Sequence, residues 1–202
     1  IDVKEMNIHL LSLSAHKFNG PKGIGALYLR NGVKIIPEMS GGAQENRRRA
    51  STENVPGIVG MGKAAELANK KLSQKRQRLR RLRDKLIIGV EKSVDEIILN
   101  GPRGDRRLPN NVSFCFKYIE GESILLNLDM HGIAASSGSA CTSGSLEPSH
   151  VLLALGLDAG TAHGSVRLSL GSNNDEEDVE EVLEILPGII QKLRDMSPLY
   201  EE

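Results

Sequence analysis

Apolar positions along this chain follow two spacings, one typical of strands and one typical of helices. Short apolar or alternating runs predict strands at residues 10–13, 25–29, 96–99, 112–116, 133–135 and 165–170. Apolar spacings of three and four residues predict helices from Pro56 to just before Asp95, over 122–131, over 148–155, and after a capping Asn174. Helices and strands interleave, so the pattern indicates the α/β class, with an α+β arrangement in the second half.

The longest predicted helix also divides the chain. Leu72, Leu79 and Leu86 recur every seven residues, with Ala68 and Leu82 between them. One face of this helix is therefore expected to pack against another element. We expect three parts, namely residues 1–55, a connecting helix over 56–94, and a small α+β domain over 95–202.

A lysine stands just beyond the first predicted strand. Lys17 is preceded by Ser14 and His16 and is followed by a loop rich in glycine and proline that runs to Gly25. The lysine amine forms Schiff bases with carbonyl compounds, and pyridoxal phosphate (PLP) is the commonest such partner in enzymes. A lone lysine is usually a solvated surface residue, so only the flanking residues favour a cofactor lysine here.

A cysteine lies in a loop of small residues further along the chain. Serine, glycine and alanine surround Cys141 over residues 136–144, which would leave its thiol accessible and its loop mobile. The thiolate form of such a residue is a nucleophile. The alternative is an inert buried thiol, the usual state of a cysteine, and Cys115 in its apolar strand fits that alternative.

A single arginine interrupts the apolar strand predicted over 165–170. A charged residue at such a place is rarely buried without a partner. The guanidinium group of Arg167 is suited to bidentate capture of a carboxylate. A structural ion pair is the competing explanation.

Several separate motifs along the chain carry a resemblance to a known family. They are Ser14-Ala15-His16-Lys17, Gly20-Pro21-Lys22-Gly23, Thr52-Glu53-Asn54-Val55-Pro56, Ser137-Gly138-Ser139-Ala140-Cys141 and Gly164-Ser165-Val166-Arg167-Leu168-Ser169-Leu170-Gly171. In this order the chain resembles the C-terminal half of NifS/IscS-type cysteine desulfurases, which are class-V, fold-type-I PLP enzymes. The resemblance implies the C-terminal part of a PLP-dependent transferase fold. Residues 1–55 would then be the end of the large, PLP-binding domain with its lysine loop, and residues 95–202 the small domain with its cysteine loop.

The resemblance also implies a reaction and roles for the residues. L-cysteine would become L-alanine, with the sulfur held as a persulfide on Cys141 and passed to an acceptor or scaffold protein for iron-sulfur cluster assembly or thiolation. Lys17 would hold PLP and move the Cα proton, Ser14 and His16 would bind the cofactor phosphate, and Arg167 would hold the substrate carboxylate. For His16, a hydrogen bond to the backbone at the strand end remains the alternative.

One further implied role requires a second subunit. Thr52 matches the family threonine that reaches the PLP phosphate of the partner, so a homodimer is expected. Ser51 stands where the family usually has glycine, and if the backbone there has a positive φ, serine costs about 1 kcal/mol. Gln44 and Glu45 lie in the same loop and receive no role.

Composition limits the partners. The chain has 26 basic and 26 acidic residues and 3% aromatic residues, so neither a global field nor stacking rings favour nucleic acid. The run from Lys70 to Lys85 holds nine basic residues and one acid, and we interpret it as a solvated helix face. No apolar window is long enough for a membrane span. The two cysteines fit a reducing cytoplasm, and the histidines lack metal-ligand spacing.

Alternatives to a complete desulfurase remain at this point. In the family, the N-terminal half supplies the aspartate that pairs with the pyridinium nitrogen, and no such segment precedes Lys17 here, so the chain is expected to be incomplete and weakly active alone. It could instead belong to another class-V PLP enzyme, a selenocysteine lyase or an aminotransferase. A non-catalytic dimerisation module is the third alternative.

Overall fold

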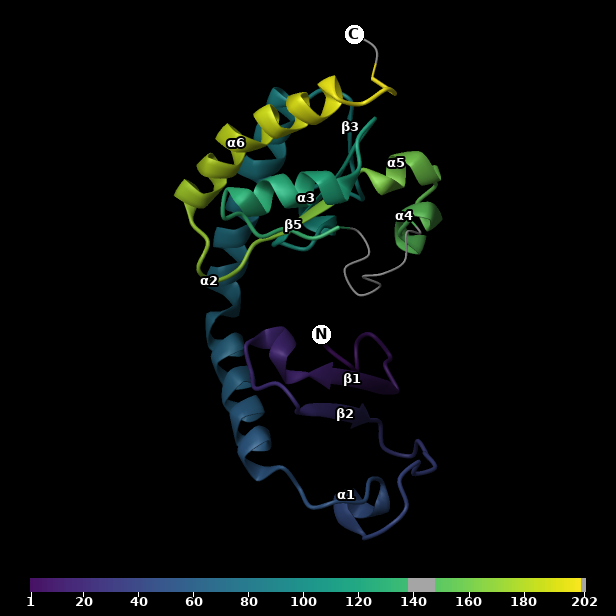
Figure 1. Cartoon of the computed structure of the whole chain (residues 1–202). Coiled ribbons are helices and arrows are strands. Elements are labelled where there is room, and N and C mark those ends of the chain that lie inside the picture. The colour runs from purple at the N-terminus through teal and green to yellow at the C-terminus, as the bar shows by residue number, and fades with distance from the viewer. Residues whose placement is uncertain (138–147, 201–202) are drawn as a thin grey trace. The chain divides into compact units, whose positions relative to one another are not determined.

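The computed structural model describes residues 1–137 and 148–200. The chain separates into two compact units, Ile1–Ser73 and Gln74–Glu202, and each is described by itself. Helix α2 (Val55–Ser93) contributes to both units (Figure 1). It matches the helix predicted over 56–94, whereas the division of the chain into three domains stays a prediction.

The first unit is built around a two-stranded antiparallel sheet. Strand β1 (Leu10–Ser14) pairs along its length with β2 (Gly25–Leu29), and both match predicted strands. The short 3-10 helix η1 (Ala15–Phe18) follows β1 directly. A Cβ atom at Gly25 would lie 2.5 Å from the Leu13 carbonyl oxygen, so the strands can pair this closely only with glycine there. Helix α1 (Gln44–Arg47) precedes α2.

The second unit combines a three-stranded antiparallel sheet with helices. Its strand order is β3-β4-β5. The strands are β3 (Ile97–Leu99), β4 (Asn111–Phe116) and β5 (Ser165–Ser169). The helices are η2 (Gly104–Arg106), α3 (Gly121–Met130), α4 (His150–Ala154), α5 (Ala159–His163) and α6 (Glu176–Asp195). The mixed architecture confirms the predicted α/β class.

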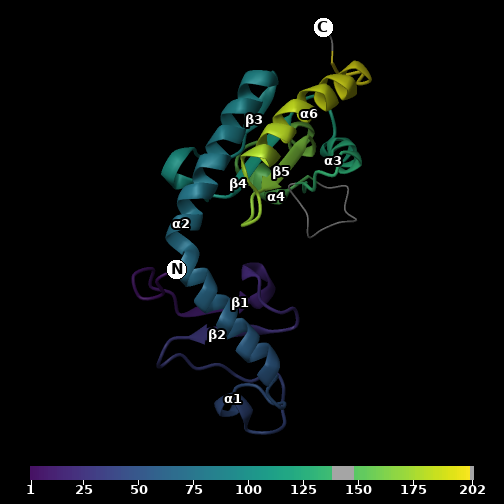
Figure 2. The ribbon, with the colours of Figure 1, turned by 90° about the vertical axis from the view of Figure 1, so that its left-hand side faces the viewer.

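The larger of two apolar clusters forms the core of this second unit. The second half of α2 packs with α6 and α3 against the sheet, as Figure 2 shows from the side. The fully buried side chains at its centre are Leu86, Phe114, Ile124, Leu128, Leu186 and Ile190. Helix α6 begins at a capping box, in which the Asp175 carboxylate accepts from the Asp178 amide and Asp178 bonds back, an arrangement that satisfies free amides at the helix start.

Several expectations for individual residues are wrong. Residues 133–135 form no strand, and the neighbouring Ser136 makes an isolated bridge to Arg167 of β5. Leu72 is 59% exposed although it belongs to the predicted apolar stripe. Asn174 is not the helix cap, because Asp175 takes that place.

The ends of the predicted helix over 148–155 also differ from the structure. Helix α4 is shorter, because Pro148 and Ser149 lie outside it. The sequence prediction did not include α5, which is capped by the Asp158 side chain.

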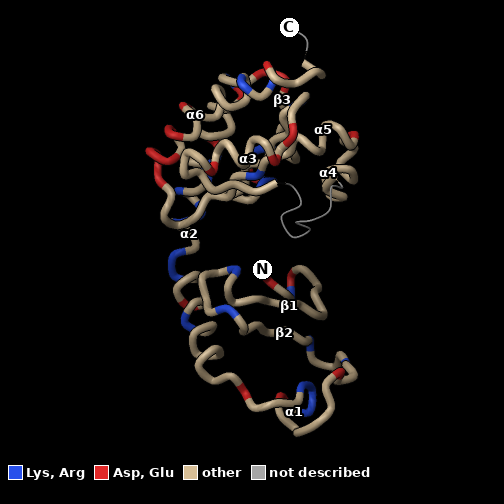
Figure 3. The backbone as a smooth tube through the Cα atoms, viewed as in Figure 1, with Lys and Arg blue, Asp and Glu red and all other residues tan. Residues whose placement is uncertain are grey.

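The basic run on α2 is partly solvated, as expected, and partly structural. Arg78 donates to the carbonyl oxygens of Asn174 and Ser172, and Lys85 pairs with Glu180 of α6. Acidic residues gather along α6 in Figure 3. The acids of this helix therefore offset part of the basic run. Among the described residues, no helix combines the length and apolar character that crossing a membrane requires.

Candidate cofactor and substrate site

The predicted cofactor lysine lies on a tight turn held by a buried alanine. Ala15 is completely buried, its amide donates to the Ile24 carbonyl at 3.1 Å, and its carbonyl accepts from Gly20 at 2.9 Å. A Cβ atom at Gly20 would lie 2.9 Å from the Ala15 side chain. Alanine and glycine at these two positions therefore allow the chain to turn sharply after β1 and to fix the backbone of Lys17.

The three predicted PLP ligands of this turn keep their functional groups free. Ser14, His16 and Lys17 are exposed, and none of their side chains makes a hydrogen bond to another described residue. Ser14 is the N-cap of η1, where serine normally accepts from a helix amide, yet its hydroxyl makes no such bond. A hydroxyl, an imidazole and an amine suit a phosphate and an aldehyde, so these residues fit PLP.

Thr52 follows a loop with unusual backbone geometry. Ser51 has φ of 120°, so the condition under which serine is costly at this position is met. The exposed Thr52 side chain makes no hydrogen bond within the part of the chain that the structure describes, and Ser51 Oγ donates to its carbonyl at 3.2 Å. The hydroxyl of Thr52 is thus available to a ligand. The sequence analysis assigned no role to Gln44, which accepts a hydrogen bond from the Ser51 amide at 3.2 Å.

Arg167 lies at the centre of β5. Its neighbours Val166 and Leu168 belong to the buried core, so the half-buried guanidinium group extends to the other face of the strand. The Arg167 backbone pairs with Ser113 of β4 and with Ser136. Its Nε is buried and has no hydrogen-bond partner among the described residues. A buried donor without a partner is rare, and a carboxylate would satisfy it.

Of the two cysteines, the structure describes the surroundings of Cys115 only. Cys141 lies outside the described residues, so its role stays a prediction. Cys115 is fully buried in β4, and its thiol lies 3.4 Å from Asn100 Oδ1. Burial raises the pKa of the Cys115 thiol, and the hydrogen bond to Asn100 lowers it by less. The prediction that Cys115 is an inert buried thiol agrees with this environment.

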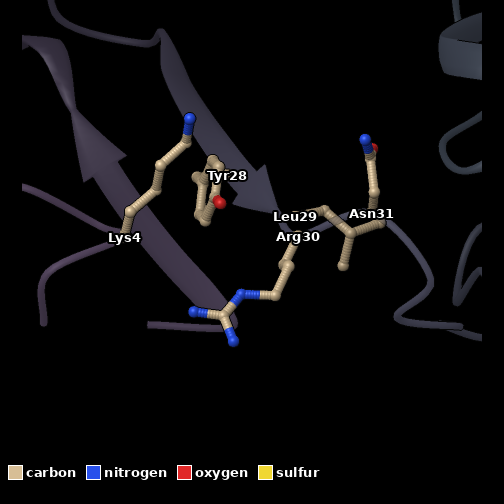
Figure 4. A pocket seen from close by; sticks show the side chains of 5 residues that line it. All are labelled: Lys4, Tyr28, Leu29, Arg30 and Asn31. Carbon is tan, nitrogen blue, oxygen red and sulfur yellow. The ribbon is translucent and has the colours of Figure 1, made fainter. Parts of the chain in front are cut away.

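A pocket in the first unit contains none of the predicted site residues. It is lined by Lys4, which precedes β1, and by residues at the end of β2 (Figure 4), namely Tyr28, Leu29, Arg30 and Asn31. The Arg30 guanidinium donates to Asn7 Oδ1 at 2.8 Å and also contacts His9. Arg30 therefore fastens the segment before β1 to the end of β2.

The turn and Thr52 in the first unit, and Arg167 in the second, each keep groups that suit PLP or its substrate, and sequence comparison defines the family. The chain belongs to the class-V aminotransferase family, whose pattern matches residues 1–182. This family and the cysteine desulfurases related to it depend on PLP. The resemblance derived from the motifs is thereby confirmed.

Individual relatives make the comparison more specific. Cysteine desulfurase IscS of Clostridium botulinum is 61% identical over all of this chain and 51% of the relative. Cysteine desulfurase IscS of Methanosarcina thermophila is 60% identical over 98% of this chain and 49% of the relative. The chain therefore spans about half the length of the curated relatives it matches.

Solved structures agree with this assignment. A NifS-like protein is 36% identical, with a TM-score of 0.82 over 95% of this chain and 48% of its own. The NifS-like protein from Rickettsia africae is 29% identical, with a TM-score of 0.83 over 95% of this chain and 50% of its own. SspA in complex with cysteine is 35% identical, with a TM-score of 0.59 over 84% of this chain and 46% of its own.

Proposed function

We propose that the protein containing this chain is a cysteine desulfurase that converts L-cysteine to L-alanine and leaves the sulfur on Cys141. The observation that carries the proposal is the turn after β1, where buried Ala15 fixes the backbone and the Lys17 amine is exposed without a partner among the described residues. The similarity to IscS proteins over the whole chain and to SspA in complex with cysteine supports the choice of substrate.

Each residue of the site then has a task. Lys17 holds the PLP aldehyde, and the Ser14 hydroxyl and His16 imidazole bind its phosphate. In a homodimer, the hydroxyl of Thr52 of the partner subunit would also bind this phosphate. When bound, PLP supplies an electron sink that weakens bonds at the substrate's α-carbon. Lys17 moves the proton at that carbon, and Arg167 binds the substrate carboxylate through its unpartnered Nε.

Sulfur transfer is assigned to Cys141. Its thiolate attacks the substrate sulfur, so that a sulfur–sulfur bond forms while the bond between sulfur and the substrate β-carbon breaks. The electron pair of the broken bond stays with the carbon skeleton, which takes up a proton and leaves as alanine. The persulfide passes its terminal sulfur to an acceptor, either a scaffold for iron-sulfur cluster assembly or a component of a thiolation pathway.

The two cysteines provide a matched test in the whole protein. Cys141→Ser is expected to abolish alanine formation from cysteine, because a hydroxyl cannot accept the sulfur. Cys115→Ser should retain it, since this buried residue makes only a local contact with Asn100. Alanine formation that survives Cys141→Ser would contradict the proposal and favour another class-V reaction.

The cofactor role has its own test. Reduction of the loaded protein with borohydride should fix PLP to Lys17, and peptide mapping identifies the modified residue. Lys17→Ala should abolish the adduct, whereas Lys22→Ala in the following loop should not. Labelling at any other lysine would contradict the assignment.

A further inference from the structure

The loop that leads to Thr52 holds an unusual amount of left-handed backbone. We call residues 41–52 the threonine loop. Its residues Glu45, Asn46 and Arg47 have φ of 48°, 56° and 62°, and Ser51 has φ of 120°. None of these residues is glycine, so the Cβ atom makes positive φ sterically costly at each of them. Such backbone persists only where surrounding contacts over-determine it, and it concentrates at ligand sites.

Two contacts close the threonine loop. The Gln44 side chain reaches back over Gly42, where its amide lies against the space a Cβ atom would take, and its Oε1 accepts from the Ser51 amide at 3.2 Å. At the base of the loop, a Cβ atom at Gly41 would lie 3.0 Å from the buried Ala50 side chain. Gln44 is therefore the side chain that joins the strained left-handed turn to the strained residue before Thr52.

The closed loop leaves the threonine side chain free. Thr52 is exposed, and its hydroxyl bonds to no other described residue, while Ser51 Oγ donates to its carbonyl at 3.2 Å. The backbone on the N-terminal side of Thr52 is thus held by Gln44 through the Ser51 amide. A side chain presented in this way loses little freedom when it binds a ligand.

We propose that Gln44 is a positioning residue for PLP binding, because it holds the threonine loop in the strained form that presents the Thr52 hydroxyl to the cofactor phosphate. This inference rests on the proposed function, in which Thr52 binds that phosphate. Without the Gln44 acceptor, the residues with positive φ relax toward ordinary backbone and the Thr52 hydroxyl moves away from the phosphate. Gln44 itself touches neither substrate nor cofactor in this proposal.

The test measures PLP dissociation from the loaded whole protein. Gln44→Met keeps the size of the side chain but removes the acceptor, and we expect PLP to dissociate about fivefold faster, the effect of one net hydrogen bond. Gln44→Glu keeps an acceptor at the same position and should stay near the unmodified rate. Gln77→Met, an exposed glutamine replaced on α2, is the matched control and should leave the rate unchanged.

A double-mutant cycle with Thr52→Val separates positioning from a general structural effect. If Gln44 acts through Thr52, then Gln44→Met should not accelerate PLP loss further in the Thr52→Val background. Equal acceleration in both backgrounds would overturn the inference. If Thr52→Val accelerates PLP loss and Gln44→Met alone does not, the inference is also overturned and the role of Thr52 stands. No change with Thr52→Val would instead refute the role of Thr52 in the proposed function.

Discussion

Arg83 provides a prediction whose size can be worked out from the structure. Its side chain is 1% exposed although it lies in the basic run of α2. Nη1 donates to the carbonyl oxygens of Arg107 at 3.0 Å and Leu108 at 3.2 Å, and Nε and Nη2 donate to Asp84 Oδ1. Replacement by methionine keeps an unbranched, flexible side chain and removes every donor.

Three effects decide the cost of Arg83→Met. The buried Arg107 carbonyl loses a donor, and a buried group left unsatisfied costs about 1–3 kcal/mol, whereas water can replace the donor at the part-buried Leu108 carbonyl. The Asp84 side chain is 44% exposed, so water replaces the arginine and the ion pair contributes about 0–1 kcal/mol. Burial, and then the charge of Arg83, lower the pKa of the Arg107 guanidinium, so removing Arg83 also relieves a repulsion. We expect a net loss of about 2–3 kcal/mol.

Urea unfolding followed by circular dichroism measures this loss. Arg81→Met on the same helix is the matched control, because Arg81 is exposed and its replacement should change stability by less than about 0.5 kcal/mol. Equal unfolding midpoints for the two variants would refute the view that Arg83 holds the loop at Arg107 and Leu108. A change in the slope of the transition would indicate an altered unfolded state rather than a lost contact.

Three further predictions follow from single contacts. Ser51→Gly should raise the free energy of unfolding by up to about 1 kcal/mol, because glycine accepts positive φ. The control Ser73→Gly within α2 should lower it. A lower free energy of unfolding in both variants would contradict the argument. Iodoacetamide should leave Cys115 unmodified in the folded protein and modify it in urea, as mass spectrometry would show. The pKa of Asp158 is lowered, mainly by the Thr161 hydroxyl, from an ordinary value of 3.8, so its stabilising charge is present above pH 3.8 and lost as the pH falls through the lower folded value. The melting temperatures of the protein and of Asp158→Asn should therefore converge below pH 3.8, and a constant difference would exclude this linkage.

The apolar pattern predicted the strands that pair locally or lie in the core. β1 and β2 form a hairpin-like pair, and β4 and β5 alternate between core and opposite face. The strand predicted over 133–135 is absent because its apolar residues pack against the core, while the ladder contact seen among the described residues falls on Ser136. A short apolar run in the sequence does not predict whether a neighbouring strand will form backbone hydrogen bonds with it.

A signal for the buried arginine was present in the sequence. Arg83 lies four residues after Leu79 and three before Leu86, and such spacings share one helix face. The periodicity that predicted a buried stripe therefore also placed a charge within it. Its partners could not be predicted, because the carbonyls of Arg107 and Leu108 belong to a loop distant in sequence.

The site shows a similar division. The motif at Ser14–Lys17 identified a turn that the structure builds around Ala15, and comparison with the family's usual glycine marked Ser51 as a place where positive φ would be costly, which the structure shows it to have. Gln44 could not be found in this way, because its partner is a backbone amide. Backbone partners depend on loop geometry rather than on residue type.

The arginines of the second unit indicate which buried charge is reserved for a ligand. Arg83, Arg107 and Arg194 are buried, and each donates to backbone carbonyls of the chain. Arg83 also donates to the Asp84 carboxylate, and Arg107 to Asn111 Oδ1. A chain that satisfies these three groups so fully would not be expected to leave a fourth without reason. Yet Arg167 keeps a buried Nε without a partner among the described residues. These buried arginines find their partners within the chain, so the unpartnered Nε of Arg167 argues for an anionic partner that the described residues do not supply.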